Sequence, residues 1–221
     1  EFDVQNEGTI SFEYDYKFET IVADTDCISF GVASKSDTGK DASSGDGRIF
    51  QLKMVKDKIQ YKAGNASDYT KYDIDGTDWV SIRVELDLAA KKCNIYVGNT
   101  LALADQPIAL KSADKTLTGV DCLAFFTDKP TYADVLIDNI GVYKLVTTSS
   151  VTPDAPESDN ESKEEVLSVK FDTASDVKDN GIYADGAMLV SDSDAAATQK
   201  ARYEFDVQNE GTISFEYDYK F

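Results

Sequence analysis

Apolar and polar side chains alternate with a period of two along much of the chain, and helical periodicity is almost absent. The clearest run covers residues 10–18. In a strand, successive side chains point to opposite faces, so this run predicts a strand with one buried face. The residues of its apolar face are Ile10, Phe12, Tyr14, Tyr16 and Phe18, and those of its polar face are Ser11, Glu13, Asp15 and Lys17.

Further runs of this kind are short and are separated by turns rich in Gly, Asn and Asp. They predict strands over residues 27–33, 48–55, 58–62, 79–88, 92–97, 122–127, 135–145, 167–172, 188–191 and 202–207. Such a series predicts an all-β fold built as an antiparallel sandwich. The residues expected in its core are Phe12, Tyr14, Tyr16, Trp79, Ile82, Val84, Ile95, Leu136 and Ile140.

One segment is repeated without a change. Residues 1–18, EFDVQNEGTISFEYDYKF, recur as residues 204–221, which gives the chain a period of 203 residues. The repeat indicates a tandem array or a duplication added by engineering. Residues 147–165 are acidic and rich in Ser, Thr and Pro, and this composition is typical of an extended linker. Residues 1–146 are then the main body of a module, and residues 166–221 are the opening strands of the next repeat, so that one module is split across the repeat boundary.

Two motifs carry a resemblance to a known fold. The run from Gly76 to Asp87, GTDWVSIRVELD, followed by Lys92 to Asn99, KCNIYVGN, resembles a hairpin of concanavalin A-like and laminin-G-like jelly rolls. The run from Val135 to Tyr143, VLIDNIGVY, is similar to the last strand of the same fold. The resemblance implies an antiparallel jelly-roll module of a bacterial tandem-repeat surface protein. It says little about activity, because this fold serves lectins, glycanases and structural modules.

Charge and missing residue types narrow the function classes. The chain has 41 acidic and 22 basic residues, a net charge of −19, which disfavours nucleic acid and anionic membrane surfaces as partners. No apolar run is long enough to insert into a membrane. The chain starts at Glu1 without a signal peptide, so we expect it to be a fragment of a secreted or cell-surface protein.

Enzyme activity is not expected. The chain has no histidine, which removes histidine-activated nucleophiles and most zinc chemistry. Glycanases of the jelly-roll fold carry paired carboxylates on one strand. Here Glu13 and Asp15 come close to that pattern, but Lys17 stands where the second Glu is needed. The three cysteines, Cys27, Cys93 and Cys122, lie in strand-like runs and fit either small core residues or one disulfide with a spare thiol.

Two kinds of ligand site can be proposed from single residues. The jelly-roll resemblance implies a structural Ca²⁺ held by Asp138 and Asp172, although aspartates at such positions also form turns. No other cofactor is indicated. A glycan would stack on aromatic side chains in or beside loops, and the candidates are Tyr61, Tyr69, Tyr72 and Tyr132.

The main functional expectation is a structural repeat module of an extracellular fibre or adhesin stalk, with neighbouring copies of itself as partners. The alternative is a carbohydrate-binding module of a secreted glycan-active protein. Two identical segments compete for one position in the sheet, so we expect residues 166–221 to complete the sheet of the next subunit rather than pair with residues 19–146 of their own chain. The residues of this subunit joint would be Phe205, Val207, Ile213, Phe215, Tyr217 and Tyr219.

Overall fold

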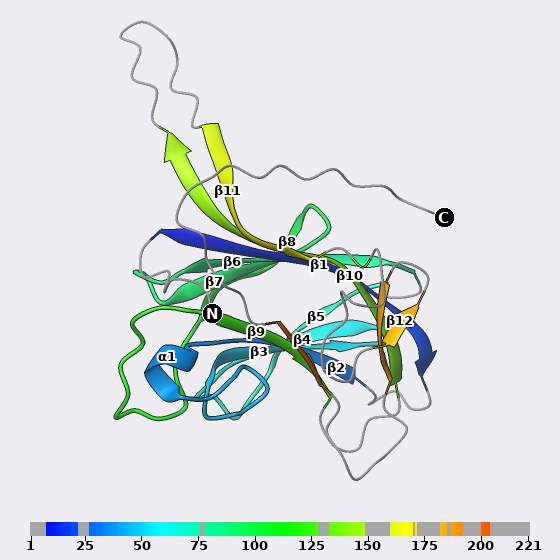
Figure 1. Ribbon diagram of the computed structural model, residues 1–221, viewed down its shortest axis with the longest axis horizontal. Helices are drawn as coiled ribbons and strands as arrows, with labels where there is room; N and C mark the ends of the chain where they lie inside the picture. The colour runs from blue at the N-terminus through cyan, green and yellow to red at the C-terminus, as the bar shows by residue number, and fades with distance from the viewer. Residues whose placement is uncertain are drawn as a thin grey trace, which may run out of the picture.

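The computed structural model describes residues 8–21, 27–75, 78–127, 133–148, 160–169, 171, 182–184, 187–191 and 200–203. This part of the chain is nearly all-β, with antiparallel sheets stacked in two layers like a β-sandwich (Figure 1). The expected all-β antiparallel class is therefore confirmed. One short helix, α1 (Lys35–Thr38), follows β2.

The upper layer in Figure 1 is the larger sheet. In spatial order it contains β12 (Ile182–Ala184), β13 (Ala187–Ser191), β10 (Ala133–Thr148), β1 (Thr9–Ile21), β6 (Val80–Asp87), β7 (Lys92–Val97) and β8 (Thr100–Pro107). An eighth strand, β11 (Asn160–Val169), also pairs with β10. We call this the eight-stranded sheet.

The lower layer is the six-stranded sheet. Its strands, in spatial order, are β14 (Lys200–Tyr203), β9 (Cys122–Phe126), β2 (Cys27–Ala33), β3 (Arg48–Val55), β4 (Lys58–Ala63) and β5 (Thr70–Asp73). The bounds of β2, β3 and β7 agree with the sequence-based prediction, whereas β5, β8 and β12 were not predicted.

The core lies between the two layers and is rich in aromatic side chains. Phe30 of β2 is at its centre, with the ring centroids of Tyr14 and Phe125 at 4.8 and 5.3 Å. Offset and edge-to-face aromatic pairs of this kind are stabilised beyond their buried area. The expected core residues found buried are Phe12, Tyr14, Tyr16, Ile82, Val84, Ile95 and Ile140.

Two expected core residues are not buried, because neither lies at a strand position whose side chain points into the core. Trp79 is 37% exposed, because in β6 the even-numbered positions from Val80 onward point inward. Leu136 is half-buried, because a bulge in β10 lies between it and Ile140 and puts these two side chains on opposite faces of the strand. On β10 the inward positions before the bulge include Ile137, and those after it include Ile140, so the bulge reverses the alternation.

The three cysteines do not form a disulfide. Cys27, Cys93 and Cys122 are all buried thiols. Burial raises the pKa of Cys93 to about 12 and that of Cys122 to about 11. Both therefore act as small core residues, which was one of the two interpretations of the sequence.

The described strands after residue 159 pair with the body of their own chain, contrary to expectation. Both β11 and β13 pair with β10, on the edge that faces away from β1, and β14 pairs with β9. A segment tethered to its own sheet meets that edge at a high effective concentration, which favours pairing within the chain. Of residues 166–221, those that pair within their own chain in the structure are 166–169, 182–184, 187–191 and 200–203. The proposed joint residues Phe205, Val207, Ile213, Phe215, Tyr217 and Tyr219 lie outside the described residues.

Strand pairing also enters the acidic segment 147–165. Strand β10 continues to Thr148, and β11 begins at Asn160. The ammonium of Lys163 in β11 forms an ion pair with Glu13 of β1 and lies 4.9 Å from the centre of the Tyr143 ring. These contacts place residues 160–165 in the sheet rather than in a linker.

Candidate ligand pocket on the outer face of the eight-stranded sheet

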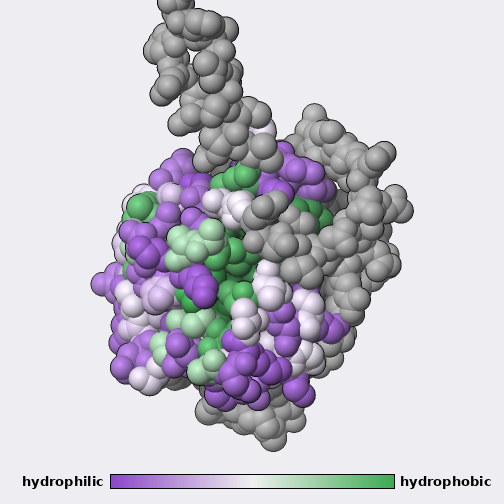
Figure 2. Space-filling model, turned by 90° about the vertical axis from the view of Figure 1, so that its left-hand side faces the viewer, coloured by the Kyte–Doolittle hydropathy of each residue, from purple (hydrophilic) through white to green (hydrophobic). Residues whose placement is uncertain are grey.

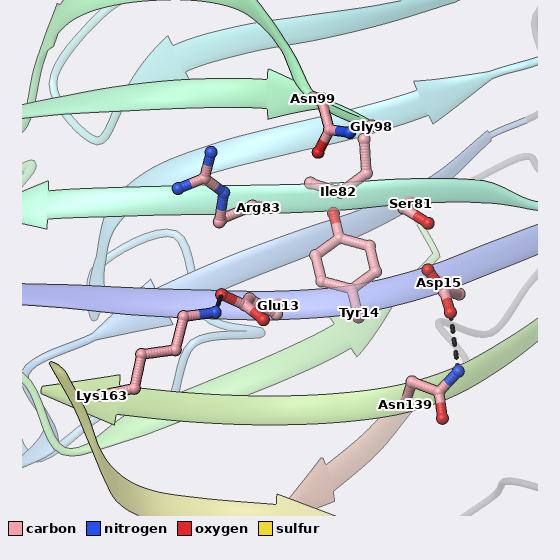
Figure 3. Close-up of a pocket in the computed structure, with 10 residues that line it drawn as sticks. All are labelled: Glu13, Tyr14, Asp15, Ser81, Ile82, Arg83, Gly98, Asn99, Asn139 and Lys163. Carbon is pink, nitrogen blue, oxygen red and sulfur yellow. Dashed lines mark hydrogen bonds and ion pairs between the residues drawn. The ribbon is translucent and has the colours of Figure 1, made fainter. Parts of the chain in front are cut away.

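A cavity of about 600 Å³ lies on the eight-stranded sheet, on the face turned away from the core. Tyr14 and Ile82 point into the core, so strand alternation turns Glu13 and Asp15 of β1 and Ser81 and Arg83 of β6 outward. Three further elements surround these strands (Figure 3). They contribute Gly98 and Asn99 from the β7–β8 turn, Asn139 from β10 and Lys163 from β11.

The bulge in β10 shapes one side of this pocket. Glu13 pairs with Gly141 and Asp15 pairs with Asp138, so β10 has one more residue than β1 in this interval. Asn139 within the bulge has a φ of 52°, a left-handed conformation that Asn adopts more readily than most residues. Its side-chain amide donates a hydrogen bond to the Asp15 carboxylate over 2.7 Å. The bulge therefore turns the Asn139 amide toward β1, where it orients Asp15.

Charged and aromatic groups continue the polar surface toward β7. Arg83 pairs in register with Tyr96 on β7, and its guanidinium lies 3.8 Å from the centre of the Tyr96 ring. The same guanidinium forms an ion pair with Glu85, two positions along β6. This arrangement holds a cation over an aromatic ring, which limits the conformations of both side chains.

The pocket therefore combines hydrogen-bond acceptors and donors within a small area. Glu13 and Asp15 supply acceptors, Arg83 supplies donors, and the amides of Asn99 and Asn139 supply both. The Glu13 side chain is 17% exposed and forms an ion pair with Lys163 (Figure 3). Such a set suits an uncharged ligand with many hydroxyl groups, because each hydroxyl both donates and accepts hydrogen bonds.

The pattern of a glycanase site is not completed here. Lys17 lies two residues beyond Asp15 on the outward-facing side of β1, and its ammonium is 3.6 Å from the Glu19 carboxylate. The position of the second carboxylate in a retaining glycanase is thus held by a cation in an ion pair.

The sequence-predicted calcium ligands are only partly placed. Asp138 lies on β10 opposite Asp15, and its carboxylate accepts a hydrogen bond over 2.7 Å from the backbone N–H of Asn139. Asp172 lies outside the described residues. No group of three or more acidic or sulfur ligands occurs within the part of the chain that the structure describes. The calcium site stays a prediction.

The four candidate tyrosines do not form one surface. Tyr61 is 1% exposed, and its hydroxyl donates to the Pro107 carbonyl over 2.8 Å, so its ring is not available for stacking. Tyr69 is half-buried just before β5, and the ammonium groups of Lys53 and Lys62 lie 5.3 and 4.7 Å from the centre of its ring. Tyr72 is half-buried against the core, and Tyr132 lies outside the described residues.

Sequence reasoning did not single out Arg83, Tyr96, Asn99 or Asn139. The alternation that placed Glu13 and Asp15 on a polar face could have placed Arg83 as well, because β6 shows the same period. The position of Asn139 depends on the bulge, for which a single sequence contains no clear signal.

No protein-family model and no curated protein matches this chain. Among the described residues, no helix is long and apolar enough to cross a membrane.

Proposed function

We propose that this chain is a structural repeat module of an extracellular fibre or adhesin stalk, built on a concanavalin A-like jelly roll. One observation supports the proposal above the others. The strands of a single period of 203 residues form both layers, from β1 at Thr9 to β14 at Tyr203, and the second copy of residues 1–18 begins directly after Tyr203. A unit that is complete within one period and continues at once into the next is suited to assembly in series.

The composition of the module fits this role outside the cell. The net charge of the chain, −19, keeps neighbouring copies soluble at high local concentration. Its three cysteines are buried, and burial raises the pKa values of Cys93 and Cys122, which slows their oxidation. Copies join by covalent continuity along the chain or by sharing strands between subunits.

Single-molecule force spectroscopy on chains of one, two and three periods tests the proposal. A structural array should give one, two and three unfolding events of similar force and similar gain in contour length. A chain of three periods with a single long, weak event would contradict serial modules, because it would mean that the repeats do not fold as separate units. The same measurements at low and high salt concentration serve as controls for charge repulsion between modules, because salt screens this repulsion.

A second function, carbohydrate binding, is supported by the pocket over β1 and β6. Its hydroxyl-compatible groups and the Arg83–Tyr96 pair are the features that a neutral glycan would use. A glycan array followed by calorimetry on the best ligands tests this function. Asp15→Ala should lower the affinity at least tenfold, whereas the matched control Tyr69→Ala, on the other sheet, should leave it unchanged. A loss of affinity in Tyr69→Ala but not in Asp15→Ala would place the glycan site at Tyr69. If no glycan on the array binds, carbohydrate binding is rejected as a function.

A further inference from the structure

Strand β1 occupies a central position that the eight-stranded sheet requires. It pairs with β6 from Thr9 to Tyr16 and with β10 from Thr9 to Ile21. The side chains of Phe12 and Tyr14 lie against Phe30 of the opposite layer, with ring centroids at 6.1 and 4.8 Å. We call the space between β6 and β10, lined by these contacts, the β1 slot.

The chain carries a second segment able to make the same contacts. Residues 212–221 have the sequence of residues 9–18, so they supply every residue that pairs with β6 and the pairs with β10 as far as Phe18. Only the β10 pairs of Thr20 and Ile21 come from outside the repeat. These two residues are able to stay on β10 when the rest of β1 leaves, so the incoming segment replaces almost the whole strand.

The end of β14 and the start of β1 lie at the same end of the two layers. In the six-stranded sheet, Tyr203, Leu123, Val32 and Phe50 are successive partners across neighbouring strands. The Phe50 ring lies 5.5 Å from the Tyr61 ring. Tyr61 in turn contacts the other layer, where its hydroxyl accepts a hydrogen bond from the Cys93 thiol. Cys93 pairs with Leu86, and Leu86 pairs with Ile10 near the start of β1.

The connection from β14 to the β1 slot is therefore short. Nine residue steps separate Tyr203 from Thr212, and an extended chain of that length spans about 30 Å. Two packed sheets are about 10 Å apart, so the segment reaches the slot without strain. Figure 2 shows this end of the molecule, where a strip of apolar side chains runs between polar margins. The connecting residues include Phe205 and Val207, which are suited to cover such a strip.

We propose that the β1 slot has two occupants in the same chain, residues 9–18 and residues 212–221, which exchange. In the first arrangement the fold closes with β1 from the first copy, as described above. In the second arrangement residues 212–221 fill the slot, Thr20 and Ile21 stay on β10, and residues 1–18 leave the sheet. The inference goes beyond the structural role proposed above, because it depends only on the repeat and on the position of β1.

The same chain is a better source of the second occupant than a neighbouring molecule. A short tether gives an effective concentration of about a millimolar, far above ordinary protein concentrations. The exchange also makes the fold tolerant of damage to either copy. In a longer array it would let each module be closed by a strand from the period before or after it.

Three variants of the full chain test the proposal. The first is Phe12→Asp, the second is the matched change Phe215→Asp in the other copy, and the third combines both. An Asp beside Phe30 in the core is incompatible with a filled slot. Each single variant should stay folded and monomeric by circular dichroism and light scattering, because the intact copy fills the slot, whereas the double variant should lose its β-sheet signal.

Hydrogen exchange identifies the occupant directly. The two copies give identical peptides, so Lys220→Arg is introduced into the second copy as a mass label that leaves the charge unchanged. In the labelled Phe12→Asp variant, slow exchange should move from residues 9–18 to residues 212–221. Slow exchange that stays on residues 9–18, or an unfolded Phe12→Asp chain, would overturn the proposal. A folded Phe12→Asp chain with twice the monomer mass would also overturn it, because the strand would then come from a second molecule.

Discussion

The side-chain amide of Asn139 donates a hydrogen bond over 2.7 Å to the carboxylate of Asp15, across the boundary between β10 and β1. Asn139 is the residue of the β10 bulge that has a left-handed backbone conformation. The bulge therefore directs a side chain of β10 onto a polar group of the pocket. The hydrogen bond also links two segments that are 124 residues apart in sequence. The bulge thereby determines both which side chains of β10 are buried and which groups face the pocket.

Substitution of Asn139 should separate the contribution of its backbone from that of its side chain. Asn139→Gly keeps the positive φ without strain and loses only the hydrogen bond to Asp15, a loss of about 1 kcal/mol in the free energy of unfolding. Asn139→Ala loses the bond and adds strain, about 2–4 kcal/mol in all. Urea denaturation measures both values. Equal stability of the Ala and Gly variants would mean that the positive φ carries no cost.

The core and the surface aromatic residues should respond differently to truncation. Phe30→Ala removes a side chain that is 1% exposed and contacts rings from both layers, so the free energy of unfolding should fall by about 3–5 kcal/mol. Trp79→Ala removes a larger side chain that is 37% exposed, and it should cost less than about 1.5 kcal/mol. Thermal or urea unfolding of the two variants checks the order, and a larger loss for Trp79→Ala would contradict the packing described here.

The buried thiols should make the fold sensitive to alkali. Folding raises the pKa of Cys93 to about 12 and of Cys122 to about 11 from the ordinary value of 9.0. Well below pH 9 both thiols are protonated in the native and unfolded states, so they contribute no dependence of stability on pH. Above about pH 9 the unfolded chain releases protons that the native chain retains, so stability falls as the pH rises toward 12. The urea midpoint at pH 8, 9, 10 and 11 measures this fall, and a flat profile would contradict it.

The same burial predicts slow thiol chemistry in the native state. Cys27, Cys93 and Cys122 should react with a chromogenic disulfide reagent at pH 8 only as fast as the protein opens, whereas all three should react at once in denaturant. The time course of absorbance gives both rates. One thiol that reacts within seconds in the native protein would show that its strand is accessible.

The ion pair between Lys163 and Glu13 should contribute to local rather than global stability. The Lys163 side chain is 47% exposed, so solvent screens the interaction, and Lys163→Met should change the free energy of unfolding by less than about 1 kcal/mol. The amides of β11 should nevertheless exchange faster, because this contact ties the strand to β1. Lys111→Met, which removes an exposed pair with Asp46, is the matched control and should leave β11 unchanged.

The sequence by itself determined the fold class and most of the strands. Period-two alternation is strong wherever one face of a strand is buried, as in residues 10–18 and 92–97, and it is read without knowledge of the partner strand. It is weak at sheet edges, where few side chains are buried. Strands β5 and β8 are edge strands with mostly exposed or half-buried residues, and neither was predicted.

Only the tertiary structure decided which strands pair and how side chains are phased along β10. An extra residue at Asn139 reverses the alternation between Ile137 and Ile140, and its φ follows from the register with β1, which is a nonlocal property. The pairing of β11 and β13 with β10, and of β14 with β9, is likewise a property of the assembled sheets. The pocket combines five separate elements, because register and layer packing, rather than any local motif, bring distant polar groups together.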